Sequence, residues 1–148
     1  MRATARVLLV ALLAAAAAGC GGGNESKSES AAEESGRGTI TCEGDALTGS
    51  AGLPAGFPQL EGVTFVEAQG KGPTRVVDGY SDESLEGLYN EYKDRFEEEQ
   101  YKILFDELEE HDSEISYRTK DGKTEGLVAL RDGCDNDNIS IHITARPA

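Results

Sequence analysis

The strongest constraint on the fold is a change in the spacing of apolar residues near position 100. Before it, large apolar side chains recur at helical spacing and form one stripe, made of Leu85, Leu88, Tyr89, Tyr92 and Phe96. After it the period becomes two, and Ile139, Ile141 and Ile143 alternate with polar residues. Strict alternation is typical of a strand with one buried and one wet face. The chain therefore predicts a helix followed by strands.

Two short β-prone runs come before the helix. Residues 63–69 and 74–80 flank the turn sequence Gly70-Lys71-Gly72-Pro73 and predict a hairpin with a longer loop. Ser81 follows directly, and we predict it as the helix N-cap, because its hydroxyl can accept a hydrogen bond from a free N–H of the first turn. Upstream, the Pro- and Gly-punctuated run 53–60 (LPAGFPQL) predicts irregular structure.

Strand-like patterns continue after the helix to the end of the chain. Tyr101, Ile103 and Phe105 alternate, as do Ile115 and Tyr117, and residues 127–130 are apolar throughout. The dipeptide Asp121-Gly122 predicts a hairpin turn between two of these runs. Counting three strands here gives the order β-β-α-β-β-β. We therefore expect an α+β domain, with an antiparallel sheet of about five strands and one helix packed on one face.

The N-terminal segment has the organisation of an exported protein. Arg2 and Arg6 precede a twelve-residue apolar run, 7–18, which is shorter than the ~20 residues of a stable membrane span. A short apolar run after positive charges is typical of a signal peptide, here residues 1–19. Residues 21–38 lack aromatic, β-branched and large aliphatic side chains, so residues 20–38 predict a disordered linker. A single domain is expected over residues 39–148.

The end of the apolar run resembles a known processing signal. Ala17-Ala18-Gly19-Cys20 is similar to the lipobox of bacterial lipoproteins, which most often carries leucine where this chain has Ala17. The resemblance implies that Cys20 is acylated, in the manner of a palmitate-bearing lipoprotein, and becomes the new N-terminus. An ordinary secretory signal cut near Ala18 is the alternative. The glycines directly after Cys20 favour the anchor, and an exposed free thiol outside the cell is a reactive liability.

A second resemblance covers much of the domain. The run LEGLYNEYKDRFEEEQYKILFDE, followed by further strands, is similar to the helix-then-meander of many small uncharacterised exported bacterial lipoproteins. It extends roughly from Thr74 to Thr144 and rests on the spacing of core residues. The resemblance implies an α+β fold and no particular activity.

The net charge of the chain limits the classes of partner that it is expected to bind. Removing residues 1–19 takes away two of the 14 basic side chains and none of the 28 acidic ones, which leaves a formal charge of −16. A nucleic-acid partner is therefore not expected, since binding needs a basic face. Cations, basic proteins and neutral ligands remain as partners, and solubility alone also accounts for the acidity.

Two cysteines remain if Cys20 is acylated. Cys42 and Cys134 then form an even pair in an oxidising compartment and predict a disulfide. The alternative is a redox or metal pair. Neither a Cys-x-x-Cys spacing nor a nearby histidine is present to favour it.

The sequence shows no strong catalytic or metal motif. His142 lies on the polar side of the last predicted strand and is expected to be solvated, and His111 lies in an acidic turn, so no catalytic residue is assigned. Asp132, Asp135 and Asp137 are weak Ca²⁺ ligand candidates, because alternating oxygen-bearing side chains can surround that ion. The EF-hand pattern is not met, and a plain polar turn has the same composition. The acidic run 106–114 is a second weak candidate and is better explained as a solvated hairpin end.

These patterns predict a secreted, lipid-anchored protein at the extracytoplasmic face of the cell membrane. We expect a non-enzymatic binding or interaction module with an envelope protein partner and no required cofactor. Its contact surface is expected on the exposed sheet face or on the loops between strands. An acidic structural or cation-binding envelope lipoprotein is the second hypothesis. An envelope hydrolase is the third, because no nucleophile–base pair stands out.

Overall fold

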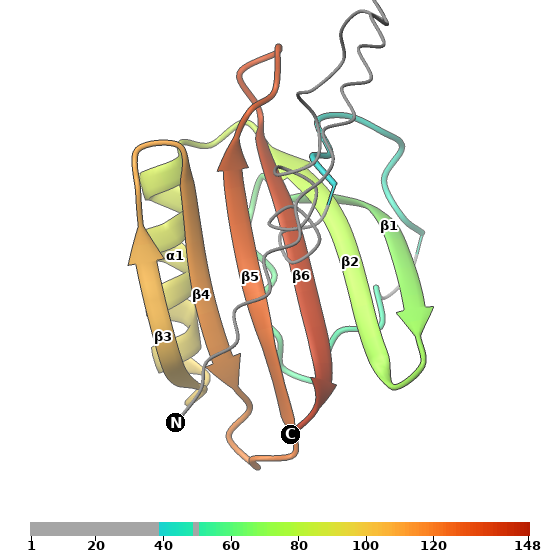
Figure 1. Cartoon of the computed structure of the whole chain (residues 1–148), viewed down its shortest axis with the longest axis vertical. Coiled ribbons are helices and arrows are strands. Elements are labelled where there is room, and N and C mark those ends of the chain that lie inside the picture. Colours follow the sequence, from blue (N-terminus) through green and yellow to red (C-terminus); the bar gives the residue numbers. More distant parts are fainter. Residues whose placement is uncertain (1–38, 49–50) are drawn as a thin grey trace, which may run out of the picture.

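The computed structural model describes residues 39–48 and 51–148. These residues form one antiparallel sheet of six strands with a single helix against one face (Figure 1). The expected α+β architecture is confirmed at that level. The predicted signal peptide, 1–19, and the whole predicted linker, 20–38, lie outside the described residues. The elements, in chain order, are β1 (Thr64–Lys71), β2 (Thr74–Ser81), α1 (Leu85–Glu98), β3 (Lys102–Leu108), β4 (Asp112–Arg118), β5 (Thr124–Asp132) and β6 (Ile139–Pro147).

The strand order across the sheet is β1-β2-β6-β5-β4-β3. The helix carries the chain from β2 to β3, which lies at the opposite edge of the sheet, and the chain then returns as a meander. Each neighbouring pair of strands is antiparallel. The last strand, β6, joins the two parts of the sheet by pairing with β2, for example at Val77 and Ile143. β1 and β3 are therefore the two edge strands.

The count of five strands was wrong, because the region after the helix holds four strands rather than three. β3 and β4 are separate strands joined by a tight acidic turn, in which the Glu109 N–H donates to the Asp112 carbonyl at 2.8 Å. The alternating runs at 101–105 and 115–117 belong to different strands, and the acidic run 106–114 between them contains the turn that separates them. The full element order is β-β-α-β-β-β-β.

The helix forms where the apolar stripe predicts it. All five stripe residues are buried, and α1 contacts β3, β4 and β5. The N-cap is Ser84 rather than Ser81: the Ser84 hydroxyl accepts from the Gly87 N–H, whereas Ser81 is the buried last residue of β2. A side chain at Gly87 would come within 2.9 Å of the Ser84 hydroxyl, which accounts for a glycine inside the first turn.

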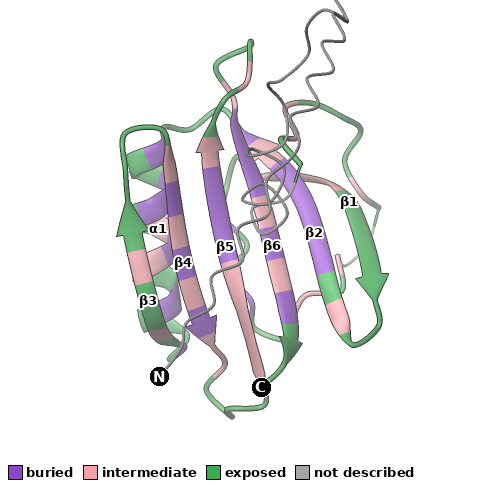
Figure 2. Cartoon of the chain, in the orientation of Figure 1, coloured by how far each residue is buried: buried purple, intermediate pink, exposed green. Residues whose placement is uncertain are grey.

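The core lies between the sheet and a cover of two parts. The helix covers β3 to β5, while the irregular segment 51–63 contributes Phe57 and Leu60 and covers the rest. Phe57 has its ring 5.7 Å from that of Phe96 and 5.5 Å from that of Tyr117, so it links the two parts of the cover to the sheet. Figure 2 shows the buried residues along the central strands, while much of β1 and β3 is exposed.

The N-terminal segment wraps around the β1 edge. Its start lies on the sheet face away from the helix, where the Thr41 N–H donates to the Ser140 hydroxyl at 2.7 Å. It then passes β1, and the Leu47 N–H donates to the Phe65 carbonyl at 2.8 Å. Beyond this point it reaches the helix side of the sheet, where it enters the core at Phe57.

Candidate functional site

The outer edge of β3 is a free backbone edge of the sheet. β3 pairs with β4 alone among the described strands, so its other side presents unpaired N–H and C=O groups. β1, at the opposite edge, accepts a hydrogen bond from Leu47 of the N-terminal segment. The two edges therefore differ near Phe65, and the outer edge of β3 receives no comparable hydrogen bond from the described residues.

Large apolar side chains are exposed along the same strand. Leu104, Phe105 and Leu108 are 42%, 51% and 40% exposed, and among the described residues Ile40 is the other large hydrophobic side chain in solvent. Beside Leu104 lies a shallow hollow of about 360 Å³ on the sheet face away from the helix, lined also by Ser116, Leu127 and Thr144. β3 thus combines a free backbone edge with an apolar surface.

A β-bulge explains why Phe105 is in solvent. The alternation of Tyr101, Ile103 and Phe105 predicts that all three face the core, and Tyr101 and Ile103 do. The pairing with β4 shifts by one residue between Ile103 and Phe105, so that Ile103 lies opposite Tyr117 and Phe105 opposite Ser116. One extra residue in a strand turns the side chains of all the following residues to the opposite face of the sheet. The expectation for Phe105 was therefore wrong.

Beyond the bulge, Asp106 faces the helix and fixes β3 to it. Its carboxylate lies 2.6 Å from Lys93 Nζ and also accepts from the Tyr89 hydroxyl. The Lys93 ammonium lies 5.0 Å from the centre of the Tyr89 ring. Hydrogen bonds from Lys93 and Tyr89 lower the pKa of Asp106, and the hydrogen bond to Asp106 raises the pKa of Lys93. This cluster holds the edge strand in place.

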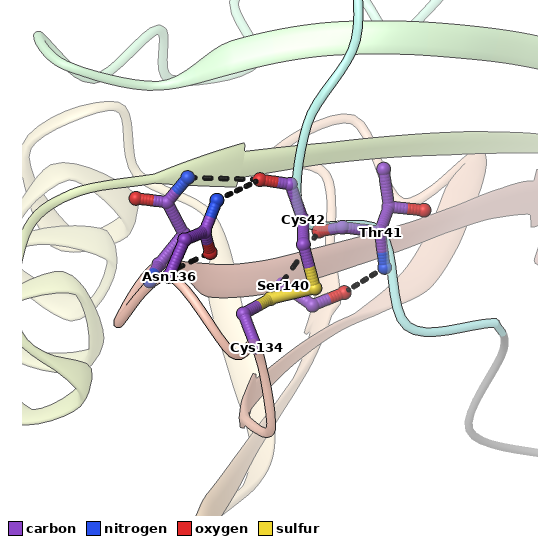
Figure 3. The surroundings of a disulfide bond; sticks show 6 residues. Thr41, Cys42, Cys134, Asn136 and Ser140 are labelled. Atoms are coloured by element: carbon purple, nitrogen blue, oxygen red, sulfur yellow. Dashed lines mark hydrogen bonds between the residues drawn. A yellow bond between two sulfur atoms is a disulfide. The ribbon is translucent and has the colours of Figure 1, made fainter.

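The predicted disulfide fixes the start of the domain to the loop between β5 and β6 (Figure 3). The Sγ atoms of Cys42 and Cys134 lie 2.06 Å apart, at bonding distance. Around them, the Cys42 carbonyl accepts from the side-chain amides of Asn136 and Asn138 at 3.2 and 2.8 Å. The side-chain amides of these two asparagines therefore hold the N-terminal segment against the β5–β6 loop.

The predicted calcium ligands are not brought together. Asp132 ends β5 and lies 3.6 Å from His111 Nδ1, while Asp135 and Asp137 lie in the loop that follows. In residues 39–48 and 51–148, no group of three or more His, Cys, Asp or Glu side chains is arranged to hold a metal ion. The acidic run 106–114 forms two strands and their turn, the hairpin end that we expected.

The two histidines lie in different environments. His111 is exposed in the β3–β4 turn. His142 was expected to be solvated, and this is wrong: its Nδ1 lies 2.6 Å from Asp78 Oδ1, and the two side chains are only 12% and 8% exposed. The pair joins β6 to β2 at directly opposed positions. Its geometry is that of an oriented imidazole.

Comparisons with protein-family models, curated proteins and solved structures found no match to this chain. Within the described part of the chain, no helix is both long and apolar enough to cross a membrane. Cys20, the predicted lipidation site, lies outside the described residues.

Sequence reasoning placed the contact surface on the sheet face or the loops and missed the edge strand. The missed residues are Leu104, Phe105 and Leu108. A weak signal was present: β3 carries four large apolar residues in seven positions without a regular period. A strand that breaks the period of two is a candidate for a bulge at a sheet edge.

Proposed function

We propose that this chain is a lipid-anchored extracytoplasmic lipoprotein that acts as a non-enzymatic interaction module, with the outer edge of β3 as its contact surface. One observation carries the proposal: three of the four exposed large hydrophobic side chains among the described residues lie on this one free edge strand. Exposed edges with apolar side chains are sites of strand pairing with another chain. The anchor at Cys20 is supported by the basic residues and the apolar run 7–18 that precede it.

The partner segment is expected to be extended. An added strand gains affinity from main-chain hydrogen bonds and specificity from the side chains that it meets, here Leu104 and Phe105. The charge of β3 runs from basic at Lys102 to acidic at Glu107, and the acidic turn follows. A partner strand with an apolar centre and a basic residue opposite Glu107 fits this order. The net charge of −14 also favours a basic partner.

The test is site-specific photo-cross-linking on intact cells. A photoreactive phenylalanine analogue replaces Phe105 in the full-length chain, and a matched chain carries it at Gln69, an exposed position on β1. We expect one recurrent envelope protein to be captured from position 105 alone, and to be lost when Cys20→Ala releases the chain. Equal capture from both positions contradicts the proposal.

Two further readouts separate the alternatives. Phe105→Lys is expected to abolish capture at a second photoreactive position, Leu104, without changing the melting temperature, because Phe105 is half exposed and outside the core. If the captured neighbour is a second copy of this chain, the module self-associates, and the envelope-protein proposal is wrong. A melting temperature that rises with Ca²⁺ while no partner is captured favours the structural, cation-binding hypothesis instead.

A further inference from the structure

A second feature lies at the opposite edge, beneath the N-terminal segment. The helix covers only β3 to β5, so the half of the sheet near β1 is covered by the irregular chain before β1. This cover leaves a half-open hollow of about 570 Å³. Its apolar lining includes Leu47, Leu53, Phe57, Val63 and Phe65, and no charged residue lines it. The size and lining are those of a small-molecule site.

Arg75 lies next to this hollow, and its side chain is exposed to solvent. Arg75, the second residue of β2, has its guanidinium between the backbones of two glycines. A Cβ on Gly52 would come within 2.9 Å of its Nε, and one on Gly70 within 3.6 Å of Nη1. The described residues supply no carboxylate that pairs with Arg75, and its side chain is exposed. The backbones of Gly52 and Gly70 thus position the Arg75 guanidinium without neutralising its positive charge.

The local charge is opposite to that of the whole protein. Arg75 lines a hollow of about 320 Å³ whose only other charged lining residue is Arg146, which is paired with Glu125 at 3.0 Å. The chain carries 28 acidic and 14 basic side chains, yet among residues 39–48 and 51–148 no acidic side chain lines either hollow. The two hollows share Pro54, so an uncharged apolar space adjoins a positively charged one.

We propose that this paired site binds an amphipathic anion, with an alkyl chain in the apolar hollow and an anionic headgroup on Arg75. A planar guanidinium binds carboxylate or phosphate oxygens through paired hydrogen bonds. The apolar hollow excludes charge and gains free energy from each methylene that leaves water. A free fatty acid and a membrane lipid share this chemistry. The site is separate from the β3 edge and does not depend on the proposed interaction function.

The test is calorimetric titration of the Cys20→Ala chain that begins at position 20, which carries neither the apolar run 7–18 nor an acyl group, with dodecanoate below its micelle concentration. We expect saturable binding, and weakening of up to about fifteenfold for each two methylenes removed. Arg75→Gln should weaken dodecanoate binding by about tenfold or more and leave 1-dodecanol binding unchanged. Lys71→Gln, which removes a nearby charge outside both hollows, is the matched control and should change neither.

Filling the apolar hollow gives an independent readout. Ala46 is an exposed lining residue, so Ala46→Trp should abolish binding of both ligands without unfolding the domain, whereas Ala68→Trp on exposed β1 should not. Flotation with phosphatidylglycerol vesicles then separates the sources. Arg75-dependent flotation identifies a lipid headgroup, and dodecanoate binding without flotation identifies a free acid. No saturable heat with dodecanoate, or equal affinities for the wild type and Arg75→Gln, overturns the proposal.

Discussion

The Tyr117 side chain on β4 reaches across β5 and donates a hydrogen bond from its hydroxyl to the Thr144 carbonyl of β6 at 2.9 Å. It passes over Gly126, its direct partner on β5. A Cβ on Gly126 would lie 1.9 Å from the Thr144 oxygen and 2.6 Å from the Tyr117 hydroxyl. Gly126 therefore gives the tyrosine its path across the sheet.

Gly126→Ala is expected to lower the free energy of unfolding by about 3 kcal/mol or more, because the new methyl overlaps a backbone atom that cannot move freely. Urea denaturation measures the change. Gly70→Ala in β1 is the matched control, since its Cβ makes an ordinary contact at 3.6 Å. That variant should change stability by no more than about 0.5 kcal/mol. Equal effects of the two substitutions would refute the steric explanation.

Two core tyrosines should respond in opposite ways to loss of the hydroxyl. Tyr117→Phe removes the hydrogen bond to Thr144 and is expected to cost about 1 kcal/mol of stability. Tyr92 is fully buried, and its hydroxyl has no hydrogen-bond partner among the residues that the structure describes. Tyr92→Phe should therefore be neutral or stabilise the fold by up to about 1 kcal/mol. Thermal unfolding of both variants at pH 7 measures the contrast, and a destabilised Tyr92→Phe protein would contradict it.

The cluster of Asp106, Lys93 and Tyr89 predicts a pH window for stability. The pKa of Asp106 is lowered from 3.8 in the folded state, so its contribution is present above about pH 4 and is lost as the pH falls through the folded value. The pKa of Lys93 and that of Tyr89 are raised from 10.5 and 10.0, so their contributions are complete below about pH 10 and are lost as the pH rises through the folded values.

Asp106→Asn tests this window. The variant should melt below the wild type at pH 7, and the difference should disappear as the pH falls below the folded pKa of Asp106. Glu107→Gln is the control: its position faces away from the helix side, and it removes a charge from the adjacent residue. If the melting difference of Asp106→Asn persists unchanged at pH 2, the effect comes from packing rather than from the charge.

Opening the disulfide should release the start of the domain. The bridge spans 92 residues, and the chain-entropy model gives an upper value of about 4–5 kcal/mol for a loop of that length. The Cys42→Ser, Cys134→Ser double variant should lose a large part of this, and hydrogen exchange at the Thr41 N–H should accelerate. A reducing agent should destabilise the wild type alone. A wild type that is indifferent to reduction would show that the network around Cys42 is sufficient without the bond.

Sequence patterns predicted the elements that follow a regular period and failed where tertiary structure changes the period. The helical stripe was correct, and the Ile139–Ile143 alternation identified a strand and its core face, because each records a face buried over several turns or pleats. The wet face expected for that strand was wrong, since Ser140 is buried and His142 pairs with Asp78. The position of Phe105 was also predicted wrongly, because a bulge is set by the pairing with β4 and its local signal, the irregular apolar period of β3, is weak. The partnership of His142 with Asp78 was also hidden, since 64 residues separate them.

The Cys42–Cys134 bond also decides how the domain carries mechanical load. A pull on the chain before Cys42 passes through the bond into the β5–β6 loop and bypasses residues 43–71, which include β1. If a partner holds β3, tension runs from the loop through β5 and β4 to that edge. The apolar hollow is lined only by residues between positions 46 and 65, so it lies outside this path.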